Sequence, residues 1–262
     1  MKRILFAALA VLLLAGTALA QGPYTVSVTQ IVEHPSLDAM RQGFMDRAKE
    51  SGADIEYNVH IAQGNPATNV QIASQILGEQ PDLVLAITTP SSQAVAKKIT
   101  DIPIVFTGVT DPVAAGLVDS LMQPGGNVTG MTDMSPVDRQ VDLIREFLPE
   151  AKTIGVIYNA GEPNSVVLVD ILKKVCAERG LGVEEATIAN SSGVYQSAKS
   201  LVGRCDAIYV PVDNTVVSAL ESAVKVCTEN RLPLFTGDTD SVKRGSVAAL
   251  ALDYYRMGLQ TA

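Results

Sequence analysis

The sequence predicts an α/β protein made of two Rossmann-like lobes, each with a parallel sheet flanked by helices. Short continuous apolar runs, such as 83–87 between Pro81 and Pro90, are typical of parallel strands buried on both faces. Segments with helically spaced apolar residues follow these runs, and the two patterns alternate along the chain. A Gly/Pro-rich turn at 124–126 divides the alternation into two parts, which favours two lobes.

The first half begins with an alternating, β-branched segment at 24–31, which predicts a strand. The next helix places Leu37, Met40, Phe44 and Ala48 on one face and ends at Gly52. By the same criteria we expect strands at 24–31, 55–62, 83–87 and 102–107, and helices at 37–51, 68–77 and 93–99.

The second half repeats this pattern after a turn segment at 122–130, where we place the first passage between lobes. We expect lobe 1 to comprise 21–130 with 246–262 returning to it, and lobe 2 to comprise 131–245. A helix that starts after Asp253 without a C-cap indicates that the chain is truncated. The expected strands are 153–158, 182–188, 206–210, 232–235 and 247–252, and the helices are 136–148, 166–179, 194–202 and 216–230.

The N-terminus has the three parts of a secretory signal peptide, which we expect to be residues 1–20, cleaved after Ala20. Lys2 and Arg3 precede an apolar run, and small residues end it. Gln21 stands where a bacterial lipoprotein would have Cys, so no lipid anchor is expected. A retained N-terminal anchor is the alternative. The sequence therefore predicts an exported, periplasmic protein.

The composition argues against several classes of partner. The net charge is −8 without a cluster of Lys or Arg, which argues against nucleic acid and anionic membranes. Cys176, Cys205 and Cys227 have no zinc-ligand spacing. Either Cys205 forms a disulfide with one of the other two cysteines, or all three are buried free thiols. The sequence leaves both alternatives open. No metal or cofactor is predicted, and we expect a monomer.

Polar residues collect at the segments that follow the predicted strands, here called tips. Ligands of open α/β sheets bind outside the carboxyl ends of the strands, so the tips are candidate binding positions. None of the candidates is Lys or Arg, which argues against phosphate and other polyanions. Hydroxyl donors together with carboxylates suit a zwitterion, and a polyol is the next best match. The candidate ligand-binding residues are Glu33, His34, Thr88, Thr89, Ser91, Thr110, Asp111, Asn164, Ser165, Asp213, Asn214, Asp238 and Asp253.

Some candidates have an equally good structural reading. Asp213 and Asp238 each follow a buried strand and either cap the next helix or point into the cleft. His34 is either a turn residue or a ligand contact. No nucleotide fingerprint, nucleophile elbow or H-E-x-x-H motif is present, so the sequence does not support an enzyme.

Several segments resemble the periplasmic substrate-binding components of ABC transporters, in the type-I family whose members bind tryptophan or other aromatic amino acids. The resemblance implies two lobes that close on a ligand in the cleft between them and present it to a membrane permease. The segments that carry it are 33–38, 89–90, 106–112, 125–130, 158–165, 212–215 and 253–255.

Together these observations predict a binding protein for an amino acid with an apolar or aromatic side chain. Thr88, Thr89, Ser91 and Ser165 would hold the carboxylate, and Asp213 or Asp238 the ammonium group. The alternatives are a periplasmic sensor coupled to a histidine kinase or chemoreceptor, a binder of a sugar or nucleoside, and, ranked last, a hydrolase.

Overall fold

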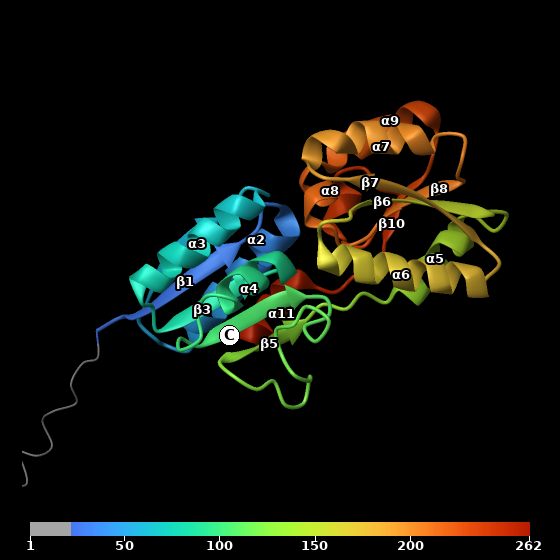
Figure 1. The fold of residues 1–262 in the computed structure, drawn as a ribbon. Coiled ribbons are helices and arrows are strands. Elements are labelled where there is room, and N and C mark those ends of the chain that lie inside the picture. The colour runs from blue at the N-terminus through green and yellow to red at the C-terminus, as the bar shows by residue number, and fades with distance from the viewer. Residues whose placement is uncertain (1–21) are drawn as a thin grey trace, which may run out of the picture.

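The structure, a computed structural model, describes residues 22–262, and the predicted signal peptide 1–20 lies outside them. Two lobes lie side by side, each with a five-stranded parallel sheet between layers of helices (Figure 1). The strand orders are β2-β1-β3-β4-β5 and β10-β9-β8-β6-β7. This is the predicted fold class. No helix of residues 22–262 has the length and apolarity needed to span a membrane.

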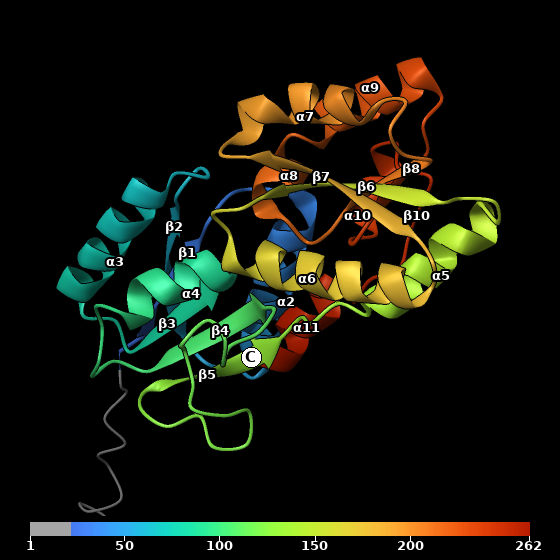
Figure 2. The ribbon, with the colours of Figure 1, turned by 45° about the vertical axis from the view of Figure 1, so that its right-hand side comes forward.

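Lobe 1 follows the predicted alternation closely. Its apolar strands β1 and β3 form the centre of the sheet, and their side chains pack into one continuous core. Helices α2 and α11 pack together on one face, and α3 packs with α4 on the other (Figure 2). The elements are β1 (Tyr24–Gln30), α2 (Pro35–Glu50), β2 (Ile55–Ile61), α3 (Pro66–Glu79), β3 (Leu83–Ile87), α4 (Thr89–Ala96), β4 (Ile104–Val109), β5 (Val128–Thr132) and α11 (Tyr254–Thr261).

Lobe 2 repeats the design with a separate core on each face of its sheet. Helices α5 and α6 cover one face, and α7 and α9 the other (Figure 2). The elements are α5 (Val137–Phe147), β6 (Thr153–Asn159), α6 (Pro163–Glu178), β7 (Gly182–Ile188), η1 (Ser191–Gly193), α7 (Val194–Leu201), β8 (Ala207–Val210), α8 (Asn214–Ser218), α9 (Leu220–Asn230), β9 (Leu234–Thr236), α10 (Asp240–Lys243) and β10 (Ala248–Ala249).

The structure differs from the sequence-based expectations at the passages between lobes. The turn at 124–126 leads into β5, an edge strand paired with β4, so the chain first leaves lobe 1 after Thr132. This strand was not predicted, because its sequence is not a continuous apolar run. Thr129 and Gly130 in its middle are exposed. We expected the return from residue 246, whereas β10 still pairs with β9 in lobe 2.

Two predicted helices also have different bounds. Helix α4 begins at Thr89 rather than Gln93, because Pro90 is accommodated in the first turn, where no helical N–H is needed. The helix expected at 216–230 is two helices, α8 and α9, which meet at a non-helical Ala219. The earlier start of α4 brings the β3 tip directly against the helix N-terminus.

The two crossing segments, 133–136 and 250–253, form the connection between lobes. The Gln140 side chain donates to the carbonyl of Leu250 at 2.7 Å, and the Tyr254 hydroxyl donates to Asp133 at 3.4 Å. The first bond ties α5 of lobe 2 to the returning crossing, and the second ties α11 of lobe 1 to the first crossing.

Candidate functional site

A cavity of about 770 Å³ lies between the lobes, beside the carboxyl ends of their central strands. Lobe 1 contributes Pro90 and Ala94 from the start of α4, and lobe 2 contributes Pro163 and Ile188. Its volume is in the range of small-molecule sites, and most of its wall is aliphatic. It lies where the topology of an open parallel sheet places a ligand.

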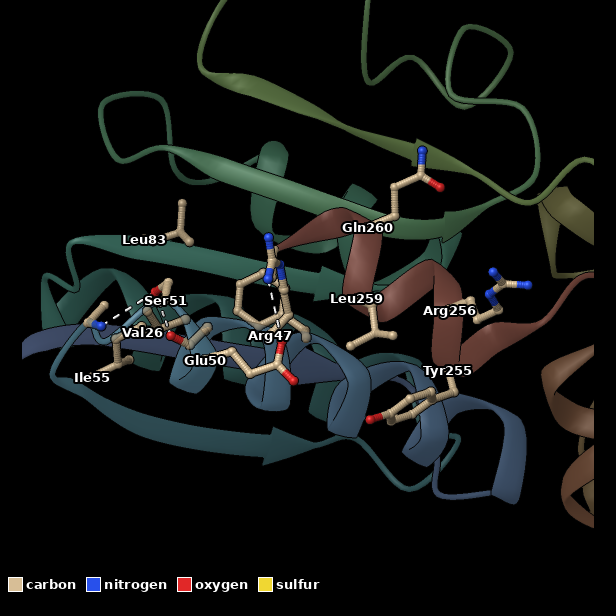
Figure 3. A pocket seen from close by; sticks show the side chains of 14 residues that line it. Val26, Arg47, Glu50, Ser51, Ile55, Leu83, Tyr255, Arg256, Leu259 and Gln260 are labelled. Carbon is tan, nitrogen blue, oxygen red and sulfur yellow. Dashed lines mark hydrogen bonds and ion pairs between the residues drawn. The ribbon is translucent and has the colours of Figure 1, made fainter.

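A larger hollow of about 1,030 Å³ lies at the opposite end of lobe 1 (Figure 3). Val26, Ile55 and Leu83, at or near the amino ends of their strands, line it together with the last turns of α2 and α11. None of its lining side chains has a buried polar atom without a partner. Open parallel sheets bind their ligands at the carboxyl ends of the strands, so we take the cleft between the lobes, and not this hollow, as the candidate site.

Lobe 1 presents unpaired hydroxyl groups beside the cleft. Thr88 and Thr89, which directly precede Pro90, are buried, and neither side-chain oxygen has a hydrogen-bond partner. Thr88 has a φ of 84°, a strained conformation for a residue with a side chain, and such strain is concentrated at functional sites. It occupies the N-cap of α4 without capping the helix through its side chain, so the positive end of α4 stays available to an anion.

Ser91, in the first turn of α4, is already engaged within lobe 1. Its hydroxyl donates to Asn69 Oδ1 at 3.4 Å, and Asn69 Nδ2 donates to the carbonyl of Pro90 at 2.9 Å. Asn69 and Gln93 both line the cleft, and neither was among the sequence candidates. Mid-helix amides carry no sequence signal of their own.

Lobe 2 presents the carboxylate of Glu162, which the sequence-based candidates did not include. One oxygen accepts from the backbone and side chain of Asn214 at 3.1 and 2.6 Å, and the other from the backbone and hydroxyl of Thr215 at 2.9 and 2.6 Å. Asn164 Nδ2 donates to the carbonyl of Val212 at 2.9 Å. The amide oxygen of Asn164 is buried without a partner.

Asp213 caps the helix that follows it, which is one of the two roles that the sequence allowed. Its Oδ1 caps α8 by accepting from the N–H of Val216 at 2.8 Å. Its Oδ2 accepts from the N–H of Asn159 and from the hydroxyl of Ser165, both at 2.6 Å. Burial, reinforced by the nearby negative charge of Glu162, raises the pKa of Asp213 to about 7.

These carboxylates have no cation beside them. Within residues 22–262, no Lys or Arg forms an ion pair with Glu162, Asp213 or Asp238. Buried carboxylates normally have a positive partner, so Glu162, which lines the cavity, suits a ligand that carries one.

The His34 tip lies at a different edge of the cleft. His34 is buried, its Nδ1 has no hydrogen-bond partner, and the side chain of Asn214 in lobe 2 lies beside it. Burial lowers its pKa to about 4, against the opposing influence of Asp38, so the ring is neutral at pH 7. Asp238 accepts from the hydroxyl of Ser36 at 3.2 Å. Glu33 beside them is exposed.

None of the thirteen sequence candidates is itself a lining residue of the cavity, and three of them belong to turns or to the connection between lobes. The hydroxyl of Thr110 donates to Asp133 at the connection between lobes, at 3.1 Å. Asp111 accepts backbone N–H groups of its own turn, and Asp253 caps α11. The structure therefore places the candidates next to lining residues of the cleft, at a contact between lobes, and at turn or hinge positions.

Comparisons with known proteins agree on one family. Residues 25–262 match the family described as ABC transporter substrate binding protein. This chain belongs to that family. Its members bind substrates and are not enzymes, and the two five-stranded lobes have the architecture of type-I periplasmic binding proteins.

Relatives within the family carry named ligands. The chain is 42% identical over 237 residues to a tyrosine-binding protein of Clostridioides difficile, a match that covers 89% of this chain and 69% of the relative. A solved ABC domain from Streptococcus pneumonia in complex with L-Trp is 32% identical, with a TM-score of 0.89 over 92% of this chain and 82% of that chain.

A ligand-free solved structure resembles this chain less closely in shape. The ligand-free, open structure of a substrate-binding protein from Clostridium difficile is 42% identical over 91% of this chain and 82% of that chain, with a TM-score of 0.65. Of these two solved structures, the ligand-free one has the higher sequence identity to this chain but the lower TM-score.

Proposed function

We propose that the protein is the exported solute-binding component of an ABC importer, and that it captures an amino acid with an apolar or aromatic side chain by closing its lobes. The observation that carries this proposal is the opposed chemistry of the cleft walls. Unpaired hydroxyls and a helix N-terminus on lobe 1 suit a carboxylate. Carboxylates without a cation on lobe 2 suit an ammonium group.

The proposal assigns these groups as follows. Thr88 and Thr89 bind the ligand carboxylate together with N–H groups at the start of α4, because their side-chain oxygens have no other partner. The ammonium group donates to Asn164 Oδ1 and is attracted by Glu162 and Asp213. Asp238, the other sequence candidate for the ammonium, is assigned to the contact between lobes, because Ser36 and Ser241 already bind it.

The ligand side chain occupies the aliphatic part of the cavity. Val70, Ala94 and Ile188 supply apolar surface there, and no aromatic residue lines it. The tyrosine and tryptophan bound by the relatives favour an aromatic ligand. In this chain, aliphatic side chains rather than stacked rings would contact it.

Lobe closure is supported by the order of the structural similarities. This chain fits the L-Trp complex better than the ligand-free open relative, although its sequence is closer to the latter. Export by the predicted signal peptide, a periplasmic location, a monomeric state and delivery to a membrane permease complete the proposal.

Calorimetric titration of ligand-stripped protein tests it. L-tyrosine, L-tryptophan and L-phenylalanine should bind one to one, whereas p-cresol and indole, which lack the zwitterion, should not. Thr89→Val removes one hydroxyl at nearly constant volume and should weaken binding about tenfold or more, because a hydrogen bond to a charged group contributes about 1.5–3 kcal/mol.

Thr29→Val is the matched control. Thr29 is also buried in lobe 1 with an unpaired hydroxyl, but it lies inside β1 rather than at a tip. Its replacement should leave affinity unchanged. Equal affinities of the two variants, or binding of a sugar or nucleoside in place of amino acids, would overturn the assignment.

A further inference from the structure

The polar contacts between the lobes, apart from the crossing segments, gather at the start of α2. Among the hydrogen bonds of residues 22–262, the hydroxyl of Ser36 reaches Asp238 Oδ1 at 3.2 Å and Asp240 Oδ2 at 3.3 Å, more than 200 positions along the chain. Figure 1 shows this end of α2 against lobe 2. His34 meets Asn214 beside it.

The start of α2 lacks a cap from its own lobe. His34 is the N-cap residue but makes no side-chain capping bond, and Pro35 has no N–H group. The positive end of the helix therefore faces lobe 2, and the groups that it meets there are the carboxylates of Asp238 and Asp240. Charge and hydrogen bonding both favour contact between the lobes at this point.

Ser36, Asp238 and Asp240 meet at a different part of the boundary between the lobes from the cavity. The cavity lies between α4 and the start of α6, whereas Ser36 meets the β9 tip. When the lobes separate at this point, the Ser36 hydroxyl loses its carboxylate partners. The contact therefore requires the start of α2 to stay against lobe 2.

We propose that Ser36, Asp238 and Asp240 form a latch that stabilises the closed arrangement without touching the ligand. The inference rests on the proposed function only in assuming that the lobes open and close. A ligand that binds the closed arrangement gains affinity in proportion to the closed fraction of the free protein. The latch therefore sets affinity for every ligand by the same factor.

Ser36→Ala removes the latch hydroxyl. Titration with L-tyrosine, L-tryptophan and L-phenylalanine should show affinity weakened about tenfold, and by the same factor for each, with faster dissociation. Asp238→Asn should weaken binding in the wild-type background and have a smaller effect in the Ser36→Ala background, because the two residues share one interaction.

The matched control is Ser246→Ala. Ser246 is also buried, and its hydroxyl bonds to Thr236 within lobe 2 at 3.1 Å, so its loss should not change affinity. A factor that differs among the three amino acids would mean that Ser36 acts on the ligand itself, and affinity equal to that of Ser246→Ala would mean that no latch exists. Either result overturns the inference.

Small-angle X-ray scattering of ligand-free protein separates this inference from the proposed function. Ser36→Ala should increase the radius of gyration relative to Ser246→Ala, because fewer molecules are closed. If no amino acid binds but this increase is observed, the latch is supported and the proposed ligand is wrong. If amino acids bind and the two variants have equal affinities and scattering, the latch is wrong and the ligand stands.

Discussion

Replacing Asp133 with Asn should change how the stability of the protein depends on pH. Asp133 follows β5 at the first crossing between lobes, and its carboxyl is buried. Thr110 and Tyr254 donate to it at 3.1 and 3.4 Å. Burial outweighs these bonds and raises its pKa from 3.8 to about 6.

The direction follows from proton binding. Between pH 4 and 6 the carboxyl is protonated in the folded protein and ionised in the unfolded chain, so the folded state binds more protons. Stability contributed by this group is therefore lost as pH rises through that window. A shift of about two pKa units at 1.36 kcal/mol each makes the loss about 3 kcal/mol.

Urea unfolding of wild type and Asp133→Asn from pH 4 to pH 7.5 measures the effect. The stability of the variant relative to wild type should increase by about 3 kcal/mol across this range, because Asn cannot titrate. Contributions from other groups, including Asp213, cancel in the comparison. Any change in the hydrogen bonds to Thr110 and Tyr254 adds an offset that does not depend on pH.

Asp206→Asn is a control of opposite sign. Backbone N–H groups of Lys152 and Thr153 hold the pKa of Asp206 below its usual range, so its contribution is lost as pH falls. The relative stability of that variant should decrease as pH rises. A pH-independent difference between wild type and Asp133→Asn would refute the reasoning about burial at the hinge.

Two further predictions concern packing and charge. Gly43→Ala should lower the free energy of unfolding by about 1–3 kcal/mol in urea titrations, because a Cβ there would overlap the backbone carbonyl of Tyr255 and force α2 and α11 apart. An unchanged midpoint would contradict this close approach. Glu162→Gln should lower the pKa of Asp213 from about 7, because it removes the neighbouring charge while burial remains; carboxyl carbon NMR titration measures it, and an unmoved pKa would show that burial alone sets the value.

The sequence alone determined the fold class and most of the elements. Strands such as β3 are continuous apolar runs, and β7 begins and ends where it was predicted. Hydrophobic periodicity is a local property, so it can be recognised without knowing which strands are neighbours. The capping of α11 by Asp253 is also local, but Asp253 was predicted only as a candidate ligand contact.

The composition of the site could be predicted in part. Thr88 and Thr89 follow a buried strand, so the rule for parallel sheets makes them candidates, and in the structure they directly precede Pro90, which lines the cavity. Glu162 was not selected, because a carboxylate just before Pro163 has no sequence signal that separates a cleft wall from a helix start. Its function depends on Asn214 and Thr215, which reach it from another strand tip.

Only the tertiary structure decided which candidates face one another. Asp213 and Asp238 have the same position after a buried strand, yet the first is enclosed within lobe 2 and the second meets Ser36 across the cleft. Likewise, β5 is partly exposed and has no clear strand pattern of its own. It is a strand because it pairs with β4 at the edge of the sheet. Local patterns determine what a segment can form, whereas the partner of a polar side chain depends on contacts between segments far apart in the chain.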